Sequence, residues 1–293
     1  MDASGPASFD PALIDPAIAR AERCGALQAI HTESERIEDG GLSFLIRWVS
    51  TLASKDQARV SAAGRRGPDY NPFLPPEPEL TLGALGARHL VVLNKYPVIE
   101  RHLLLVTRRF EDQSAPLTAA DFDALRALMA QLGGLGFYNG GEEAGASQRH
   151  KHLQWIPAQP GNACLTPFVA RLPAIPAFET VCDPALQWAH RFVRLPPSGF
   201  GECSGEPLMR AFEAACSALD LRPDTDPMPP YNLLIEHDWL LLVPRSRERH
   251  ADISVNALGF AGSLFVRRAE QIDAIRRFGP LHLLAGVACP RRP

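Results

Sequence analysis

The 293-residue sequence has no C-x-x-C pair, no excess of positive charge and no long apolar run. Its scattered cysteines argue against a zinc ribbon or a dense disulfide framework, and they favour reduced thiols. The net charge of −3 gives no general attraction to nucleic acid or to an anionic membrane, because proteins that bind such partners usually carry a basic excess. The six cysteines are Cys24, Cys164, Cys182, Cys203, Cys216 and Cys289.

The N-terminal segment also lacks the features of a signal peptide. Acidic residues and prolines stand where a positive start and an apolar run would be needed. No stretch approaches the roughly 20 apolar residues that span a bilayer. The composition, 46% hydrophobic and 22% charged, is that of a folded globular protein. We therefore expect a cytoplasmic protein that has neither nucleic-acid nor membrane partners.

Regular elements are clearest in the first half of the chain. Thr118 can cap a helix whose first turn contains Asp121, and Gly133-Gly134 can end it. The first half predicts, in order, a helix within 11–27, a hairpin over 29–50 that turns at Gly40-Gly41, a proline-rich connection over 55–80, an antiparallel pair of strands from 87–97 and 100–109, a helix over 116–134, a loop over 136–148 and a strand over 149–157.

The second half begins with weak patterns, rich in proline and glycine, between Pro157 and Gly205. A helix over 208–221 and a hairpin over 231–245, turning at His237-Asp238, follow. The predicted fold class is α+β, with an antiparallel sheet flanked by helices and two halves packed as one body.

Three polar side chains alternate along the predicted strand over 149–157. Because successive side chains of a strand point to opposite faces, His150, His152 and Gln154 share one face. Directly before them, the glycines of GGEEAGASQ let backbone N–H groups approach an anion, and Ser147 and Gln148 add donors. This combination predicts a phosphate site.

A neutral imidazole can attack phosphorus when its other ring nitrogen is held by an acceptor. His152, at the centre of the trio, is the best candidate for this nucleophile. His150 and Gln154 can then donate to phosphoryl oxygens in the transition state. Alternating histidines also occur as metal ligands or as exposed polar positions. We rank a metal site lower and expect none, because no carboxylate or cysteine lies close by to complete a coordination sphere.

This pattern resembles the signature of the histidine-triad superfamily, in which an asparagine, a glycine-serine loop and alternating histidines bind and attack an α-phosphate. Glutamine stands where most hydrolases of the superfamily have a third histidine, and this is the pattern of the transferase branch. The positions that carry the resemblance are Asn139, Gly145, Ser147, His150, His152 and Gln154.

Within that branch the chain resembles ATP adenylyltransferases, also called diadenosine tetraphosphate (Ap4A) phosphorylases. The motifs are GASQRHKHLQ, LNKYP with HLLLVT, NPFLP, YNLL, VPRS and SVNALGFAG, and the similarity runs from about residue 43 to residue 290. The resemblance implies an N-terminal HIT-like catalytic domain over 1–175 and a C-terminal adenylyltransferase-type domain over 176–293. It also implies Ap4A, ATP, ADP and inorganic phosphate as small-molecule partners.

The reaction implied by the resemblance is the reversible conversion of Ap4A and phosphate to ADP and ATP, through AMP bound covalently to His152. Gln154 cannot act as a general base, which fits an acceptor that is phosphate and not water. Asn94 and Lys95 of the LNKYP motif, together with Lys55, are further candidates for binding the polyphosphate. No covalent cofactor is expected, although a divalent cation, Mg²⁺ or Mn²⁺, can accompany the nucleotide.

Three other functions compete with this one. Hexose-1-phosphate nucleotidyltransferases share the histidine-to-glutamine pattern, but they usually have proline where this chain has Lys151. A dinucleoside polyphosphate hydrolase would normally keep the third histidine. The third alternative is a nucleotide-binding or metal-binding protein without turnover. His102 is adjacent to a buried-looking strand, and the sequence leaves its role undecided.

Overall fold

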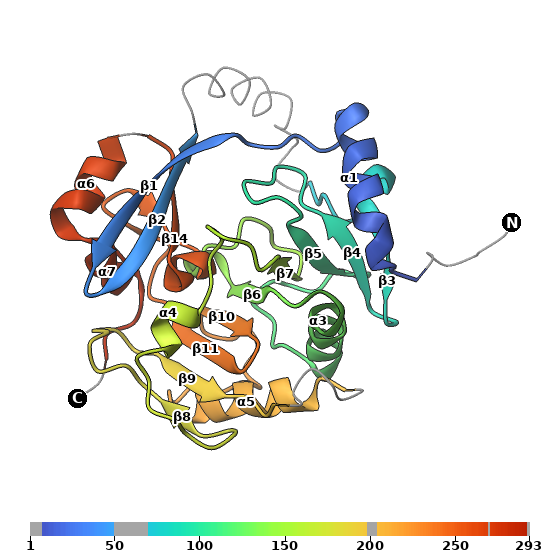
Figure 1. Ribbon diagram of the computed structural model, residues 1–293. Helices are drawn as coiled ribbons and strands as arrows, with labels where there is room; N and C mark the ends of the chain where they lie inside the picture. Colours follow the sequence, from blue (N-terminus) through green and yellow to red (C-terminus); the bar gives the residue numbers. More distant parts are fainter. Residues whose placement is uncertain (1–7, 50–69, 198–203, 269, 292–293) are drawn as a thin grey trace, which may run out of the picture.

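The computed structural model describes residues 8–49, 70–197, 204–268 and 270–291 (Figure 1). Its centre is a nine-stranded sheet in the order β3-β4-β5-β7-β6-β10-β11-β9-β8, with antiparallel neighbours throughout. The strands are β3 (Thr81–Leu85), β4 (His89–Leu93), β5 (Leu103–Thr107), β6 (Leu135–Gly140), β7 (His152–Ile156), β8 (Thr180–Val181), β9 (Arg191–Arg194), β10 (Tyr231–Glu236) and β11 (Trp239–Pro244).

A second, three-stranded sheet lies beside α6 and α7 (Figure 1). In this sheet β14 (Ser263–Val266) runs parallel to β2 (Leu42–Val49), which also pairs with β1 (Thr32–Asp39). The short strands β12 (Arg249–His250) and β13 (Ile253–Ser254) form a separate pair. The α-helices are α1 (Ile14–Arg23), α3 (Ala119–Leu132), α4 (Thr166–Val169), α5 (Glu206–Ser217), α6 (Glu270–Phe278) and α7 (Pro280–Val287), and the 3-10 helices are η1 (Pro11–Leu13), η2 (Pro78–Leu80), η3 (Glu142–Ala144) and η4 (Ala257–Ala261).

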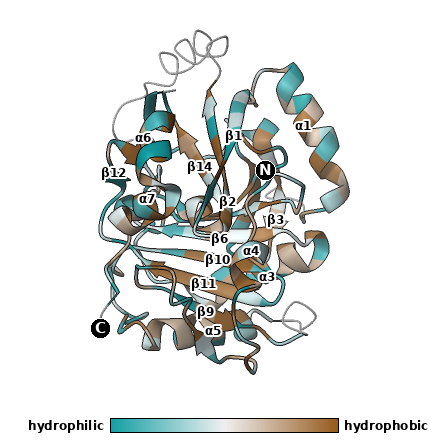
Figure 2. Cartoon of the chain, turned by 60° about the vertical axis from the view of Figure 1, so that its left-hand side comes forward, coloured by the Kyte–Doolittle hydropathy of each residue, from teal (hydrophilic) through white to brown (hydrophobic). Residues whose placement is uncertain are grey.

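The nine-stranded sheet carries a hydrophobic core on each face. Parts of this sheet are brown, the colour of hydrophobic residues, in Figure 2. Alternate residues of one strand enter opposite cores, as Leu233 and Leu234 of β10 do. The first core also takes residues from α1, α3 and α5, and the second takes residues from the small sheet, α6 and α7. The cleft described below lies on the side of the small sheet.

The large sheet joins the two halves of the chain without a break. β6, from the first half, pairs with β10 along six residues, from Leu135 opposite Glu236 to Gly140 opposite Tyr231. Both cores contain side chains from before and after this junction. The α+β prediction, with an antiparallel sheet, flanking helices and two halves packed as one body, is confirmed.

Several local predictions agree with the structure. The hairpin at Gly40-Gly41 and the capping box of Thr118 and Asp121 before α3 are both present. The first predicted helix is shorter than expected, since α1 ends at Arg23. Lys55 and most of its proline-rich connection lie outside the described residues. Among the residues described, no helix is long and apolar enough to cross a membrane.

The prediction of a loop over 136–148 is wrong for its first part, because residues 135–140 form β6 in the middle of the sheet. The glycines that indicated a loop serve close packing instead. A Cβ atom at Gly136 would lie 2.7 Å from the sulfur of Met129 in α3, so the missing side chain lets the helix approach the strand. The part after Gly141 does form a loop, which contains η3.

Candidate active site

The strand β7 separates its polar and apolar side chains as the alternation requires. Leu153 and Trp155 enter the core beneath α3, so His152 and Gln154 point to the opposite face. The Phe73 ring lies 5.4 Å from the His152 ring and 5.7 Å from the His150 ring, which places both imidazoles on one side. The structure therefore brings the three predicted polar residues together.

The orientation of His152 is fixed at two points. Its ring nitrogen Nδ1 lies 2.8 Å from the carbonyl oxygen of His150, and its backbone N–H donates to Oε1 of Gln113 at 2.8 Å. Because a carbonyl only accepts, Nδ1 must carry the proton and Nε2 keeps a free electron pair. Burial lowers the pKa of His152 to about 4, so the ring is neutral at physiological pH.

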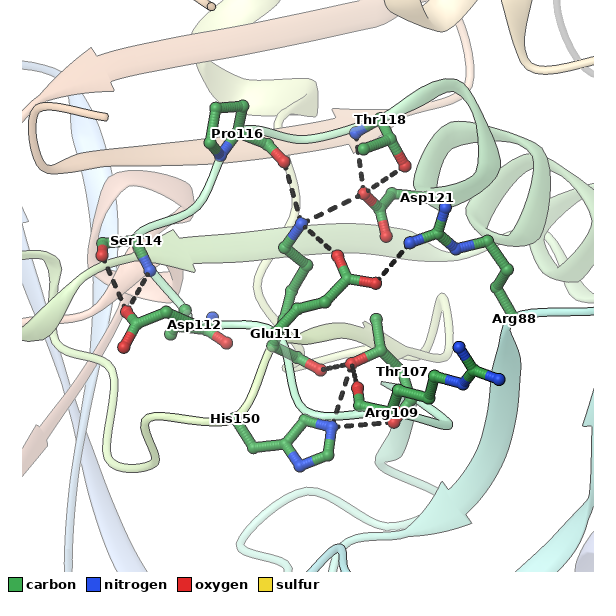
Figure 3. Close-up of polar contacts among 12 residues, drawn as sticks. Arg88, Thr107, Arg109, Glu111, Asp112, Ser114, Pro116, Thr118, Asp121 and His150 are labelled. Carbon is green, nitrogen blue, oxygen red and sulfur yellow. Dashed lines mark hydrogen bonds and ion pairs between the residues drawn. The ribbon is translucent and has the colours of Figure 1, made fainter. Parts of the chain in front are cut away.

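His150 is held by the protein through both ring nitrogens. Nε2 donates to the carbonyl oxygen of Thr107 at 2.7 Å (Figure 3). Nδ1 accepts from the amide nitrogen of Asn71 at 2.9 Å, because the amide oxygen of Asn71 already accepts from the backbone of Phe73. Burial lowers the pKa of His150. The contribution of His150 that the geometry shows is its backbone carbonyl, which orients His152.

Lys151, between the two histidines, is anchored on the opposite side of the chain. Its side chain is 1% exposed, and its ammonium group lies 2.9 Å from Glu111, 2.8 Å from the carbonyl oxygen of Pro116 and 3.6 Å from Asp121. These partners converge on one point in Figure 3. Arg88 completes the cluster by binding Glu111 at 2.5 Å. The buried ion pairs hold the start of β7 against α3.

The glycine-rich loop after β6 rests against the C-terminal half. Gly145 has a φ of +87°, and a Cβ atom there would lie 2.7 Å from the carbonyl oxygen of Val255 and 3.0 Å from the Cα atom of Asn256. Glycine is therefore required for both the backbone conformation and the close approach. Ser147, two residues later, is exposed and lines the cleft.

Asn139, near the end of β6, is a junction between the two halves. Its amide oxygen accepts from Asn232 and from the backbone of Ala257, both at 2.9 Å, and its carbonyl oxygen accepts from Gln113 at 2.8 Å. Arg245, 3% exposed, binds Asn232 as well as backbone carbonyls on both sides of the junction. Asn139 therefore connects the glycine loop and the strand of His152 to the second half.

A cavity of about 840 Å³ opens between the large sheet and the small one. Arg47, Ser263 and Phe265 line it from β2 and β14. The predicted residues that line it are Asn94, Asn139, Gly145, Ser147 and Gln154. His152 is 4% exposed and lies two residues from Gln154 in the same strand. Within the described ranges, no group of three or more His, Cys, Asp or Glu side chains is arranged to hold a metal ion.

Two predicted binding residues lie away from the cavity, and a third lies outside the described residues. Lys95 binds the carboxylate of Glu77 at 2.6 and 2.8 Å and does not line the cavity. Gln148 is half-buried and is also absent from the cavity wall. Lys55 falls outside the described residues.

Sequence reasoning missed four residues that hold the site in place, namely Asn71, His102, Gln113 and Arg245. Asn71 belongs to the NPFLP motif and His102 to HLLLVT, so both motifs carried a signal. Arg245 belongs to VPRS, a third motif that carried a signal, whereas Gln113 stands in a segment without a pattern that would distinguish it from a surface residue.

Comparison with known protein families decides the classification. The model of the Ap4A phosphorylase N-terminal domain matches residues 7–176, more than half of the chain. The chain belongs to the Ap4A phosphorylase family. The model of the ATP adenylyltransferase C-terminal domain matches residues 184–290. Together these matches confirm the resemblance that the sequence motifs indicated, and they identify the chain as a nucleotidyltransferase of this family.

Relatives within the family cover nearly the same length. Diadenosine 5',5'''-P1,P4-tetraphosphate phosphorylase 2 of Saccharomyces cerevisiae is 28% identical over 86% of this chain and 86% of its own. Protein APA1 of the same yeast is also 28% identical, over 86% of this chain and 84% of its own. The crystal structure of yeast Ap4A phosphorylase Apa2 in complex with Ap4A has the same fold, with a TM-score of 0.79 and 24% identity over 97% of this chain and 100% of that chain.

Proposed function

We propose that this protein catalyses the phosphorolysis of Ap4A to ADP and ATP, through an intermediate in which AMP is bonded to Nε2 of His152. The observation that carries the proposal is the hydrogen bond from Nδ1 of His152 to the carbonyl of His150. It leaves Nε2 as a neutral nucleophile in the strand of Gln154, which lines a cleft together with the predicted phosphate-binding residues Gly145 and Ser147. The family relatives named for Ap4A phosphorolysis support the choice of substrate.

In the first step Nε2 of His152 attacks the α-phosphorus of Ap4A, the P–O bond to the rest of the molecule breaks, and ATP leaves with the bonding electrons. The ring gains positive charge as the P–N bond forms, and the carbonyl of His150 stabilises that charge through Nδ1–H. ATP is a stable anion, so its departure needs no strong acid. A phosphate oxygen then attacks the same phosphorus, and ADP leaves as the P–N bond breaks.

The test is incubation of the purified protein with Ap4A and Mg²⁺, with and without inorganic phosphate, followed by chromatography of the nucleotides. Equimolar ADP and ATP that continue to form only with phosphate would support the proposal. Continuous release of AMP and ATP without phosphate would indicate a hydrolase. If Ap4A stays intact, the substrate proposal is wrong, and assay with nucleoside diphosphate sugars and hexose 1-phosphates then tests the transferase alternative.

The pH dependence of the first step follows from the lowered pKa of His152. An ordinary histidine, with a pKa near 6.5, loses nucleophilicity below that pH as it gains a proton. Because the pKa of His152 is about 4, we expect the rate of ATP release in a single turnover without phosphate to stay level from pH 8 to about pH 5. Rapid-quench measurement checks this, and a tenfold fall between pH 7 and 5.5 would contradict it.

Gly145→Ala tests the glycine loop. The new Cβ atom would displace the loop from Val255, and a shift of about 1 Å in a site of this kind lowers the rate about 100-fold. We expect a loss of that size in kcat/KM for Ap4A. Gly25→Ala is the matched control, since Gly25 also has a positive φ, +74°, but has no atom within 4 Å of the new Cβ. Equal losses in both variants would show that backbone strain alone is responsible.

A further inference from the structure

We propose that Asn94 and His102 are positioning residues that fix the side-chain amide of Gln154 with its NH₂ group toward the substrate phosphates. Three hydrogen bonds and the wall of the cleft support this arrangement. The inference rests on the proposed function for the identity of the substrate. The orientation of the amide can be tested without it.

The direction of the chain of hydrogen bonds is set at its first member. The backbone N–H of Tyr96 donates to the side chain of Asn94 at 3.1 Å. A backbone N–H can only donate, so the atom of Asn94 that faces it must be the oxygen Oδ1. The NH₂ group of Asn94 consequently points the other way, toward His102.

His102 is the second member of the chain of hydrogen bonds, and it keeps the same donor-to-acceptor direction. The NH₂ group of Asn94 lies 3.0 Å from Nδ1 of His102, which must therefore accept and carry no proton. The proton of the neutral ring is then on Nε2. Burial lowers the pKa of His102 to about 4, so a second proton is absent at physiological pH. His102 thus presents a single donor, and it faces Gln154.

The third member is the amide of Gln154. Nε2 of His102 lies 3.0 Å from this side chain and donates, so the atom that receives the hydrogen bond is the oxygen Oε1. The NH₂ group has no hydrogen-bond partner within the described part of the chain, and Gln154 lines the cleft together with Gly145 and Ser147. The amide therefore offers two N–H donors where the phosphates would lie.

This orientation matters because the two ends of an amide have nearly the same shape and opposite polarity. A reversed Gln154 would turn its oxygen toward the anionic phosphates and repel them. In the observed orientation it can donate to the oxygen that gains charge as ATP leaves, an interaction whose removal lowers kcat about 10²–10³-fold in comparable sites. The side-chain amide of Gln154 therefore has to be held in one of its two orientations by neighbouring groups, and Asn94 and His102 do this.

A double-mutant cycle tests the coupling. We expect Gln154→Ala to lower the single-turnover rate of ATP release at saturating Ap4A by about 10²–10³-fold, and His102→Ala to lower it at least about tenfold. Because His102 acts through Gln154, adding His102→Ala to Gln154→Ala should lower the rate by less than about twofold more. If the fold losses of the two single variants multiply in the double variant, the proposal is overturned.

Two further measurements separate positioning from folding and from the choice of substrate. His190→Ala is the control for loss of a buried histidine, since His190 lies near the β8 edge of the sheet, away from the cleft, and should keep the rate. Long-range ¹H–¹⁵N NMR of the histidine-labelled protein, with His102→Gln for assignment, should show the Nε2–H tautomer of His102 without any substrate. An Nδ1–H tautomer would overturn the proposal even if the protein cleaves Ap4A as proposed.

Discussion

His152→Ala is expected to abolish the ATP burst and to lower the rate of Ap4A phosphorolysis by at least about 10⁴-fold, because the variant has no nitrogen to accept the adenylyl group. The intermediate can be trapped by incubating the wild-type protein, without phosphate, with Ap4A that is labelled at the α-phosphorus. The protein should then retain about one label per chain, in a bond that is stable to base and labile to acid. The variant should retain none and should still bind Ap4A.

His237→Asn serves as the control for removal of a histidine. The His237 side chain is 84% exposed at the turn between β10 and β11, and its positive φ of 42° suits asparagine. This variant should label as the wild type does. If His152→Ala were labelled normally, another nucleophile would carry the adenylate, and the role given to His152 would have to be abandoned.

Lys151→Ala is expected to lower the free energy of unfolding at neutral pH by about 3–5 kcal/mol, since it removes the positive charge that lies beside the buried carboxylate of Asp121. Burial alone would raise the pKa of Asp121, but hydrogen bonds from His89 and the charge of Lys151 outweigh it, so the pKa of Asp121 is lowered. A carboxyl whose pKa is lowered on folding stabilises the protein above its unfolded pKa of about 3.9 and loses that effect as the pH falls further. Urea unfolding measures the loss.

The control is Arg149→Ala, which removes a neighbouring but exposed ion pair. The Arg149 side chain is 87% exposed and binds Asp112 at 3.1 Å, an arrangement that contributes about 0–1 kcal/mol. The loss in Lys151→Ala should also shrink as the pH falls below about 4, where the carboxyl of Asp121 becomes protonated in the unfolded chain. Equal losses in the two variants would show that burial of the Lys151 cluster contributes nothing beyond a surface pair.

The sequence predicted those parts of the fold that depend on local patterns. The capping box at Thr118 and the hairpin turn at Gly40-Gly41 are formed by residues close together in the chain, and both are present. β6 was missed because its strand character comes from distant partners, chiefly β10. In isolation, LGFYNG reads as a turn segment, and only its burial between β7 and β10 makes it the centre of the sheet.

The candidate site, like the fold, could be predicted only in the part that depends on local sequence patterns. The alternation of His150, His152 and Gln154 follows from strand geometry and was readable from the sequence. The partners that fix these side chains were not, because Asn71 lies 79 positions from His150 and His102 lies 52 positions from Gln154. A lone buried histidine has no sequence signal that tells which amide it faces.

The position of β6 also has a consequence for how the protein is made. Asn139 in β6 and Asn232 in β10 face each other across the sheet but are 93 positions apart in the chain. A ribosome that adds roughly 5–20 residues per second needs about 5–20 s to synthesise that interval. During this time the outer edge of β6 has unpaired N–H and C=O groups next to apolar side chains, an arrangement prone to pairing with another chain. We therefore expect the nascent protein to rely on chaperones until β10 has emerged.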